Sequence, residues 1–334
     1  MARRLSVAIR VDGELDRERQ FAFVRAADEA RVETVFVPET WGRDAFSLLV
    51  QLAERTTRIQ VGTGIVNVFS RSPAALAQQF ATLDELSGGR AIAGLGTSGP
   101  RVIEHFHGLP YERPLTRVRE VIAIMRMLFA EQPLAFDGRL FRLERGFTFR
   151  FKPLRARVPI YLASFRPPGL QLAAEAADGL MPLMIPVERL AEEVGRFRER
   201  VAAAGRDPSE VVYKAPGQVV VTSDDGDAAR HEHKRTLAFY MARMGDFYHT
   251  QLSEMGWAAE VAAVREAWAA GGSGAGAGVV PDRLSESLAA IGPVERCIER
   301  LDEQAAAGVD LHGVSVSGIE SPAELRRTFE RLVG

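Results

Sequence analysis

Residues 87–100 read SGGRAIAGLGTSGP, and this stretch decides the fold. The pair Gly88-Gly89 is typical of the end of a helix. The small apolar residues that follow predict a short buried strand, and residues 94–99 predict a glycine-rich loop with accessible backbone N–H groups. Parallel α/β proteins carry their chemistry at the carboxyl ends of strands, so this loop is the first candidate for a functional site.

Strand and helix signals alternate along the rest of the chain. Strands are expected at 5–9, 35–37, 59–62, directly after Arg90, and at 160–163, 178–181, 219–221 and 314–316. Helices with apolar residues at helical spacing lie between them. We therefore predict an α/β fold, a single (β/α)8 TIM-barrel domain over residues 1–334. An open doubly wound sheet is the alternative, but no Gly-x-Gly-x-x-Gly motif follows the first strand.

Two regions interrupt the alternation and are expected to be insertions. Residues 133–158 predict a hairpin, with a turn at 136–139 and a strand at 147–151, where apolar residues alternate. Residues 226–290 are expected to be helical, except for the glycine-rich run 271–278, which predicts a mobile loop. That loop is either a lid over a site or a surface connection, and the second reading is favoured.

The composition is ordinary for a soluble globular protein, with 46% hydrophobic and 26% charged residues. A formal net charge of −2 gives no general attraction to nucleic acid or to an anionic membrane. The single cysteine, Cys297, cannot form an intrachain disulfide and is expected to be a packing residue. With no apolar signal core and no membrane-length apolar run, the sequence predicts a cytoplasmic protein.

Three segments that follow predicted strands could carry chemistry. The turn 163–169 predicts a phosphate site, where helix N–H groups and Arg166 would meet the anion, or else a plain turn. Two glycines in the segment 61–67 suggest a flat ligand packed close to the backbone, or an ordinary turn. In the third segment, Glu39 is a candidate acid/base group and Trp41 a pocket wall, whereas Asp44 could simply cap a helix.

Other kinds of site find little support. The pairs His105/His107 and His231/His233 are spaced two apart, so a helix would point their rings to different faces. Neither a Gly-x-Ser-x-Gly motif nor a Walker loop is present. A metal site and a Ser/His/Asp triad are therefore not expected.

Taken together, these segments resemble the bacterial-luciferase-like superfamily of flavin and deazaflavin oxidoreductases. The most specific motif is the Leu-Asp-x-Leu-Ser-Gly-Gly-Arg run at 83–90, which precedes Gly-Leu-Gly. The likeness extends over 35–44, 58–68, 94–99, 160–169 with 176–179, and 292–308. Within the superfamily the chain is more similar to the coenzyme F420 branch, that of methylenetetrahydromethanopterin reductase, than to luciferase itself.

The resemblance implies a cofactor at the carboxyl ends of the barrel strands. A bulge after the third strand would back its ring, often with a non-prolyl cis peptide, here at Gly64-Ile65. The cofactor-binding residues implied are Gly64, Ile65, Val66, Gly96, Thr97, Ser98, Gly99, Ala163, Ser164, Phe165, Arg166 and Gly169, and the catalytic candidates are Glu39, Thr40 and Trp41. A small-molecule substrate and a homodimer are also implied.

The chain departs from its relatives at positions that matter for proton transfer. Thr40 stands where several dehydrogenases have histidine, and Gly99-Pro100 stand where some have glutamate. The first strand ends in Ile9-Arg10 without the acid of some reductases. The family's proton-transfer residues therefore do not carry over.

The function expected is an F420-dependent oxidoreductase that transfers a hydride between C5 of the deazaflavin and an unknown small organic substrate. The arginines expected near its phosphate and acidic tail are Arg43, Arg71, Arg101 and Arg166. The alternatives are an FMN-dependent monooxygenase of the same fold, a barrel that binds the cofactor without catalysis and, least supported, a metal-dependent hydrolase.

Overall fold

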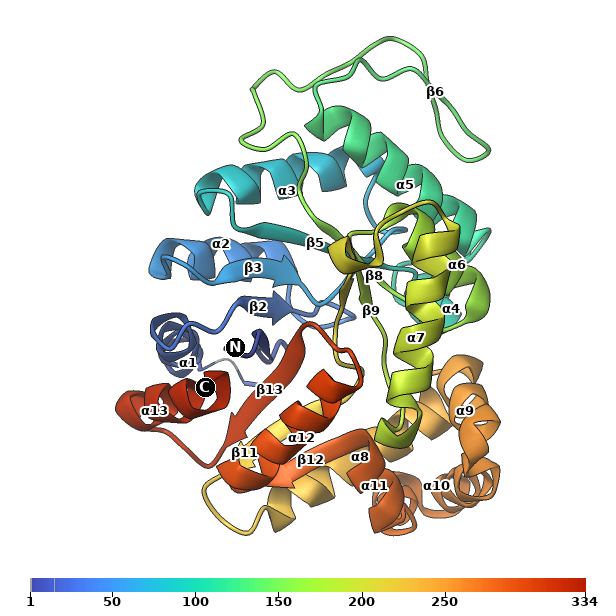
Figure 1. Cartoon of the computed structure of the whole chain (residues 1–334). Coiled ribbons are helices and arrows are strands. Elements are labelled where there is room, and N and C mark those ends of the chain that lie inside the picture. The colour runs from blue at the N-terminus through green and yellow to red at the C-terminus, as the bar shows by residue number, and fades with distance from the viewer. Residues whose placement is uncertain (1, 15) are drawn as a thin grey trace.

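The computed structural model describes residues 2–14 and 16–334 and has a parallel, curled sheet at its centre (Figure 1). Its strands are β1 (Leu5–Ala8), β2 (Thr34–Val37), β3 (Gln60–Thr63), β4 (Val66–Asn67), β5 (Ala91–Gly96), β8 (Ile160–Ala163), β9 (Gly179–Met181), β10 (Val212–Tyr213), β11 (Gln218–Thr222), β12 (Ala289–Gly292) and β13 (His312–Ser317). The predicted α/β barrel fold is confirmed. The extent of the domain, 1–334, stays a prediction.

The strands pair in the order β10-β9-β8-β5-β3-β2-β1-β13-β11-β12, and β4 adds to β5. The sheet curls back on itself, because a single parallel bridge joins Lys214, just after β10, to Leu311, just before β13. Beyond that bridge the chain continues from β10 into β11, which pairs with β13 on one side and β12 on the other. Sequence reasoning missed the short strands β4, β10 and β12.

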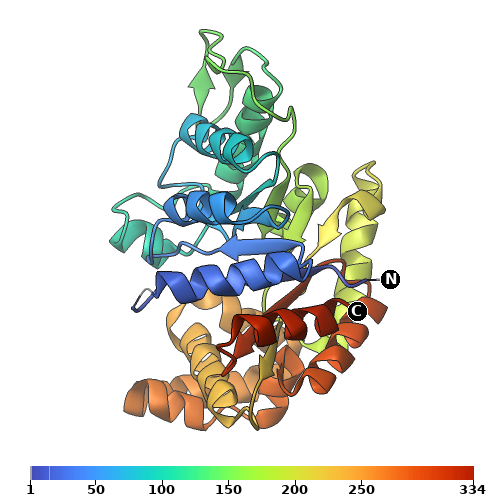
Figure 2. The same cartoon turned by 90° about the vertical axis from the view of Figure 1, so that its left-hand side faces the viewer.

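Helices cover the outside of the sheet. They are α1 (Arg17–Glu29), α2 (Ala45–Arg55), α3 (Pro73–Leu86), α4 (Pro100–His105), α5 (Pro114–Phe129), α6 (Pro167–Ala176), α7 (Val187–Ala203), α12 (Val294–Ala306) and α13 (Pro322–Val333). Figure 2 shows α1 and α13 side by side on one face of the molecule. Local caps start several of them: Ser72 Oγ accepts from Ala75 N–H at 3.2 Å, and Asp44 accepts from Ser47 N–H at 2.7 Å.

The motif at 83–90 anchors β5 rather than contacting the barrel mouth. Asp84, which is 1% exposed, accepts the N–H of Ala91 at 3.1 Å and so fixes the first residue of the strand. Arg90 donates to backbone carbonyl groups between α2 and β3, including Ile59 O at 2.7 Å. The motif therefore holds β3 and β5 in register, which is a structural reason for its specificity.

The second insertion forms a helical unit with an apolar core of its own. It comprises α8 (Asp227–Arg243), α9 (Asp246–Leu252), a π-helical turn (Ser253–Trp257), α10 (Ala258–Gly278) and α11 (Asp282–Leu288). The predicted mobile loop at 271–278 is wrong, because these residues complete α10. Glycine has low helix propensity, but here packing overrides it: a Cβ on Gly276 would lie 3.0 Å from the Trp268 ring. Only Gly272, with φ 72°, breaks the helix.

The first insertion is a hairpin of β6 (Phe136–Asp137) and β7 (Arg142–Leu143). The buried carboxylate of Glu120 on α5 holds its turn by accepting the N–H groups of residues 139–141 at 2.7–3.0 Å. The predicted strand at 147–151 is wrong: the residues alternate in polarity, but no neighbouring strand pairs with them. The rings of Phe149 and Phe151 instead stack 4.8 Å apart.

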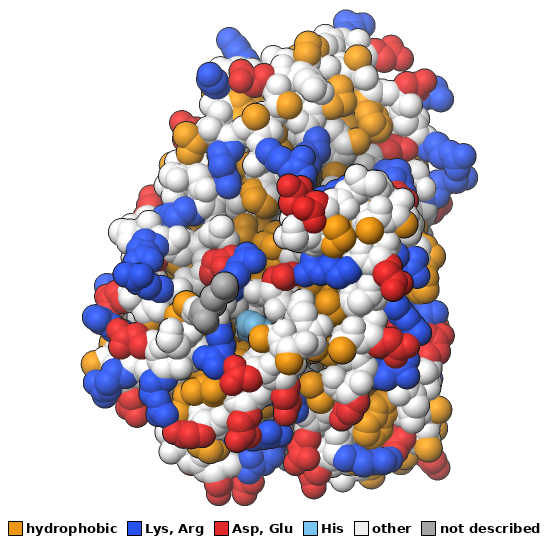
Figure 3. All heavy atoms as spheres, in the orientation of Figure 1, with side chains coloured by type: hydrophobic (Ala, Val, Ile, Leu, Met, Phe, Trp, Pro, Cys, Tyr) orange, Lys and Arg blue, Asp and Glu red, His pale blue; other side chains and the backbone are white. Residues whose placement is uncertain are grey.

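Three further observations concern the cysteine, membrane helices and surface charge that the sequence analysis considered. Cys297 is buried, which confirms its packing role, and its thiol donates to Val220 O at 3.4 Å. Among the described residues, no helix combines the length and the apolar character that a membrane crossing needs. On the face in Figure 3, acidic and basic side chains are interspersed.

Candidate functional site

The segments singled out from the sequence meet at one end of the barrel, here called the mouth. Strand pairing brings them together, because β2 pairs with β3, β3 with β5 and β5 with β8, all in parallel. The loops 38–44, 64–65, 97–99 and 164–166 each follow one of these strands at its carboxyl end. The mouth is therefore the candidate active site.

A partly buried ion-pair network lies after β2, with Glu39 as its buried member. Arg71 Nη1 is 2.7 Å from Glu39 Oε1, and Arg71 Nη2 is 2.8 Å from Glu39 Oε2 and 2.9 Å from Asp44 Oδ1. Glu39 Oε2 also accepts the N–H of Ala45, at 3.2 Å. Burial raises the pKa of Asp44, but hydrogen bonds from Ser47 and the charge of Arg71 outweigh it and hold this pKa below its usual value. Glu39 accepts all three bonds, so its geometry suits the orientation of Arg71.

Backbone strain occurs at the mouth. Of the six non-glycine residues with left-handed φ values in the described chain, three follow strands there: Thr40 at 43° after β2, Ser98 at 56° after β5 and Met184 at 55° after β9. Such residues are uncommon and persist where the surroundings hold them in place. Two of the three are residues that the sequence predicted for the site.

The chain between β3 and β4 forms the expected bulge, made by the two residues Gly64 and Ile65. The expected cis peptide at Gly64-Ile65 is wrong: no peptide bond is cis among residues 2–14 and 16–334. Two residues outside the strand pairing make the bulge instead. A Cβ on Gly64 would lie 3.1 Å from Phe36 Cβ, so the backbone passes unusually close to β2.

The loop after β5 packs against this bulge. A Cβ on Gly96 would lie 2.9 Å from Ile65 Cδ1, whereas one on Gly99 would meet nothing within 4 Å. The Tyr111 hydroxyl donates to Ser98 O at 3.2 Å, and Thr97 Oγ1 donates to the same oxygen at 3.1 Å. Gly96 therefore lets the bulge and the loop approach, and Gly99 leaves space open at the mouth.

The turn after β8 was expected to offer N–H groups at the start of its helix, but the structure differs. Pro167 and Pro168 occupy the first positions of α6 and have no N–H, so the helix start itself offers few free donors. Any amide donors for an anion must come from Ser164, Phe165 and Arg166. A Cβ on Gly169 would lie 2.1 Å from Ser164 Oγ, so a glycine is needed there.

The helical insertion contacts this side of the mouth. Arg166 Nη1 lies 2.6 Å from Glu254 Oε2 of the π-helical turn, and both side chains are exposed. Arg101 donates to Arg243 O at 3.3 Å. Arg43 does not face the site, because it donates to the carbonyl groups of Val11 and Gly13 at 3.0 and 2.8 Å.

Aromatic rings connect the two sides through the insertion. Trp41, after β2, contacts Phe239 of α8 edge-on with centroids 6.4 Å apart. Phe239 contacts Tyr240 at 6.0 Å, Tyr240 contacts Tyr248 of α9 at 4.8 Å, and Tyr248 contacts Phe165, after β8, at 5.2 Å. We call this set the aromatic bridge. Burial raises the pKa of both tyrosines.

A cavity of about 310 Å³ opens beside the ion-pair network. It is lined by Glu39, Thr40, Gly42, Asp44, Ser70, Arg71, Phe106 and His107. The Ser70 hydroxyl is buried without a hydrogen-bond partner, and Asn67 Nδ2 lies 3.2 Å from His107 Nε2. The unpartnered Ser70 hydroxyl and the open space at Gly99 fit a polar ligand at the mouth.

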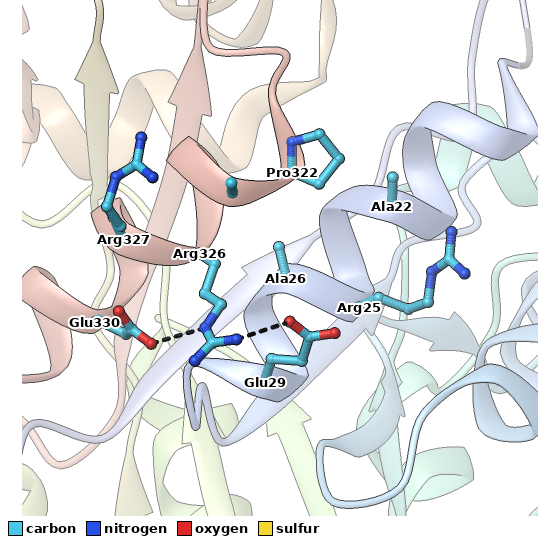
Figure 4. A pocket seen from close by; sticks show the side chains of 9 residues that line it. Ala22, Arg25, Ala26, Glu29, Pro322, Arg326, Arg327 and Glu330 are labelled. Carbon is cyan, nitrogen blue, oxygen red and sulfur yellow. Dashed lines mark hydrogen bonds and ion pairs between the residues drawn. The ribbon is translucent and has the colours of Figure 1, made fainter.

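A larger cavity of about 530 Å³ lies outside the barrel, between α1 and α13 (Figure 4). Arg326 crosses it and contacts Glu330 at 2.8 Å and Glu29 at 3.5 Å. It contains no strand end and none of the strained residues, so we do not place the active site there.

The sequence predicted most of the loops at the mouth but missed several side chains. Ser70, His107, Tyr111 and the tyrosines of α8 and α9 carry no motif, because distant segments bring them to the site. Within the described ranges, no group of three or more His, Cys, Asp or Glu side chains is arranged to hold a metal ion.

Comparison with known proteins identifies the family of the chain. The chain is 34% identical over 320 residues to a provisionally named coenzyme F420-dependent oxidoreductase of Mycobacterium tuberculosis, which covers 90% of this chain and 92% of that protein. It is 32% identical over 298 residues to the 5,10-methylenetetrahydromethanopterin reductase of Archaeoglobus fulgidus, with 86% of each covered.

Among solved structures, the coenzyme F420-dependent tetrahydromethanopterin reductase of Methanopyrus kandleri superposes with a TM-score of 0.83. The superposition covers 99% of this chain and 97% of that one at 21% identity, so it shows a shared fold. The model of the luciferase-like monooxygenase family matches residues 6–311. The chain is therefore an oxidoreductase that belongs to the bacterial luciferase-like family.

Proposed function

We propose that this oxidoreductase uses coenzyme F420 and transfers a hydride between C5 of the deazaflavin and a small organic substrate. The observation that carries the proposal is the cradle formed by Gly64 and Gly96. There, the absence of a Cβ lets the β3 bulge pack against Phe36 of β2 and lets Ile65 of the bulge pack against the loop after β5. Similarity to proteins named for F420 supports this choice of cofactor over FMN.

The chain supplies residues for each part of the cofactor. Gly64, Ile65 and Val66 would back the ring, and residues 96–99 would lie along it. The turn 163–169 would hold the phosphate through its loop N–H groups and the hydroxyl of Ser164. Arg101 and Arg166 lie at the mouth and would meet the acidic tail, whereas Arg43 is held by backbone carbonyl groups.

The bound deazaflavin supplies the hydride chemistry at its C5. The protein's part is to orient and to enclose. The paired carboxylates fix Arg71 at the edge of the cavity, where its charge and the Ser70 hydroxyl can position a polar group. The aromatic bridge would exclude water on the side of the helical insertion. A drier site strengthens the electrostatic contacts inside it. Trp41 and Thr40 face the substrate side of the cavity in this proposal.

Titration of the purified protein with F420 and, separately, with FMN tests the proposal. We expect tight F420 binding by fluorescence, weak FMN binding and no oxygen consumption with the reduced cofactor. Gly96→Ala should weaken F420 binding about tenfold or more, because its Cβ would push Ile65 into the cradle. Gly195→Ala is the matched control, since a Cβ there meets nothing within 4 Å.

Preferential FMN binding with oxygen consumption would instead make the protein a flavin monooxygenase. Binding of F420 without turnover of any substrate would favour a carrier.

A further inference from the structure

The inner surface of the barrel holds a lysine that the proposed function does not use. Only three of the 42 Lys and Arg residues are lysines, namely Lys152, Lys214 and Lys234. Lys214 follows β10, and its backbone N–H donates to Leu180 O at 3.0 Å. The preceding residue, Tyr213, packs outward against Phe197 of α7, so Lys214 faces the barrel interior.

The Lys214 side chain extends across that interior. Its Nζ lies 5.9 Å from the centre of the Phe36 ring on β2, and a Cβ on Gly313 of β13 would be 3.3 Å from it. Phe36 in turn contacts the Gly64 bulge from below. The ammonium group therefore lies one layer beneath the proposed cofactor cradle.

The walls around this ammonium are apolar. Phe36, Ile92, Tyr161 and Leu311 form one buried cluster, with Met181 and Val212 packed against it. Burial alone lowers the pKa of Lys214 to about 8. At neutral pH Lys214 is therefore charged in most molecules of the protein. A charge in an apolar setting is costly unless a partner is present.

No such partner comes from the described part of the chain, where Lys214 Nζ makes neither a hydrogen bond nor an ion pair. Buried charges elsewhere have ion-pair or hydrogen-bond partners: Asp84 pairs with Arg155, and Glu120 accepts three backbone N–H groups. The partly buried Lys214 departs from this pattern, and charges without partners in apolar surroundings mark functional positions.

The titratable groups nearest to Lys214 do not neutralise it. Tyr161 of β8 has its pKa raised by burial and is protonated. His312 of β13, whose pKa burial lowers to about 4, is neutral at pH 7. Asp310, before β13, is held by Arg198, and Glu33, before β2, is held by Arg4.

The inner surface next to the ammonium is reached by solvent. Lys214 is half-buried, and its Nζ is not among the polar atoms closed off from solvent without a partner. Gly313 and Ser315 on the inner face of β13 and Ala8 at the end of β1 also keep exposed surface. Because Ala8 and Ser315 lie toward the carboxyl ends of their strands, this exposed surface, here called the barrel hollow, runs toward the mouth.

We propose that Lys214 makes the floor of the barrel hollow an anion subsite, which binds a delocalised oxyanion of the molecule that fills the mouth. The subsite rests on the proposed function, because the mouth is where cofactor and substrate are placed. The oxyanion has two possible sources: a carboxylate-bearing substrate, or the deazaflavin ring after reduction and loss of a proton. A cation that lacks a partner selects such a group over a neutral one.

Nuclear magnetic resonance on the full chain with lysine labelled by ¹³C at Cε tests the subsite. Three lysine signals are expected, and Lys→Arg variants assign them. In the protein alone, the Lys214 signal should titrate near pH 8. Sodium acetate, oxidised F420 and reduced F420 are then added in separate samples, with Lys152 and Lys234 as internal controls.

Binding of an anion should raise the pKa of Lys214 by about one unit or more. A rise with acetate assigns the subsite to a carboxylate-bearing substrate, and a rise only with reduced F420 assigns it to the cofactor ring. An unchanged pKa with all three additions, while F420 binds, would overturn the subsite. If acetate raises the pKa but F420 does not bind, the subsite stands and the proposed cofactor is wrong.

Variants give a second measurement. Lys214→Met should reduce affinity for the responding probe at least about tenfold, whereas Lys214→Arg should keep part of it. The exposed Lys152→Met is the control and should bind as the wild type does. Equal losses for Met and Arg at position 214, in folded protein, would mean that Lys214 only packs.

Discussion

The two sides of the barrel mouth are held together in different ways. On the β2–β3–β5 side, a buried bidentate ion pair between Arg71 and Glu39 and close backbone contacts at glycines fix the geometry. On the β8 side, the helical insertion rests on aromatic edges and on the exposed pair between Arg166 and Glu254. The first side is built to keep one shape, and the second can change without loss of the barrel.

The largest effect should come from removing the buried cation. Arg71→Met leaves the Glu39 carboxylate, which is 8% exposed, without its main partner. We expect the free energy of unfolding to fall by about 3–5 kcal/mol, measured by urea denaturation. The exposed Arg145→Met should change it by less than about 0.5 kcal/mol. A cost for Arg71→Met as small as that of an exposed pair would abolish the contrast between the sides.

Lowering the pH should destabilise the helical insertion. His233 of α8 lies 2.9 Å from Ser285 Oγ of α11, and burial lowers its pKa from 6.5 to about 4. The unfolded chain takes up this proton below pH 6.5 but the folded chain only near pH 4. The stabilisation is therefore complete above pH 6.5 and is lost toward pH 4, by up to about 1.4 kcal/mol per pH unit.

The measurement is the difference between wild type and His233→Gln, because the buried His312 adds a slope of the same sign. The protection factors of amides in α8 and α11, which correct for the intrinsic exchange rate at each pH, should fall at pH 5 in the wild type and much less in the variant. The exposed His231→Gln should behave as the wild type does. An equal fall in all three proteins would remove His233 as the cause.

The aromatic bridge should contribute a smaller coupling. A double-mutant cycle with Trp41→Leu and Phe239→Leu should give about 0.5–1.5 kcal/mol between the two rings, from urea denaturation of the four proteins. The rings lie 6.4 Å apart and edge-on, which is a favourable arrangement. Additive losses would show that the insertion does not depend on this contact.

The smallest effect on stability should come from the exposed pair. Glu254→Gln should lower the free energy of unfolding by less than about 1 kcal/mol. High salt should make this decrease smaller still, because it screens the exposed pair. Its effect on ligand binding should be of opposite sign, because it releases Arg166: F420 should bind more tightly to Glu254→Gln and more weakly to Arg166→Glu. Unchanged F420 affinity in Arg166→Glu would remove this arginine from the proposed site.

The same contrast separates what the sequence predicts from what it does not. Residues 83–100 specify a helix end, a strand and a loop by local chemistry, and the structure has all three. The glycine run 271–278 was misread because its helix is stabilised by the packing of Gly276 on Trp268. The partner of Arg71 and the isolation of Lys214 depend on residues far apart in the chain, so no local pattern reveals them.

The single bridge between Lys214 and Leu311 has a mechanical consequence. A complete ring of backbone hydrogen bonds resists any change in circumference, whereas an interrupted ring widens at its break. The break lies between β9 and β11, where the segments after β9 and before β11 are joined by one backbone hydrogen bond, from Met184 N–H to Pro216 O at 3.0 Å. We expect a bulkier guest to spread this seam, while the wall proposed to back the flat ring keeps its dimensions.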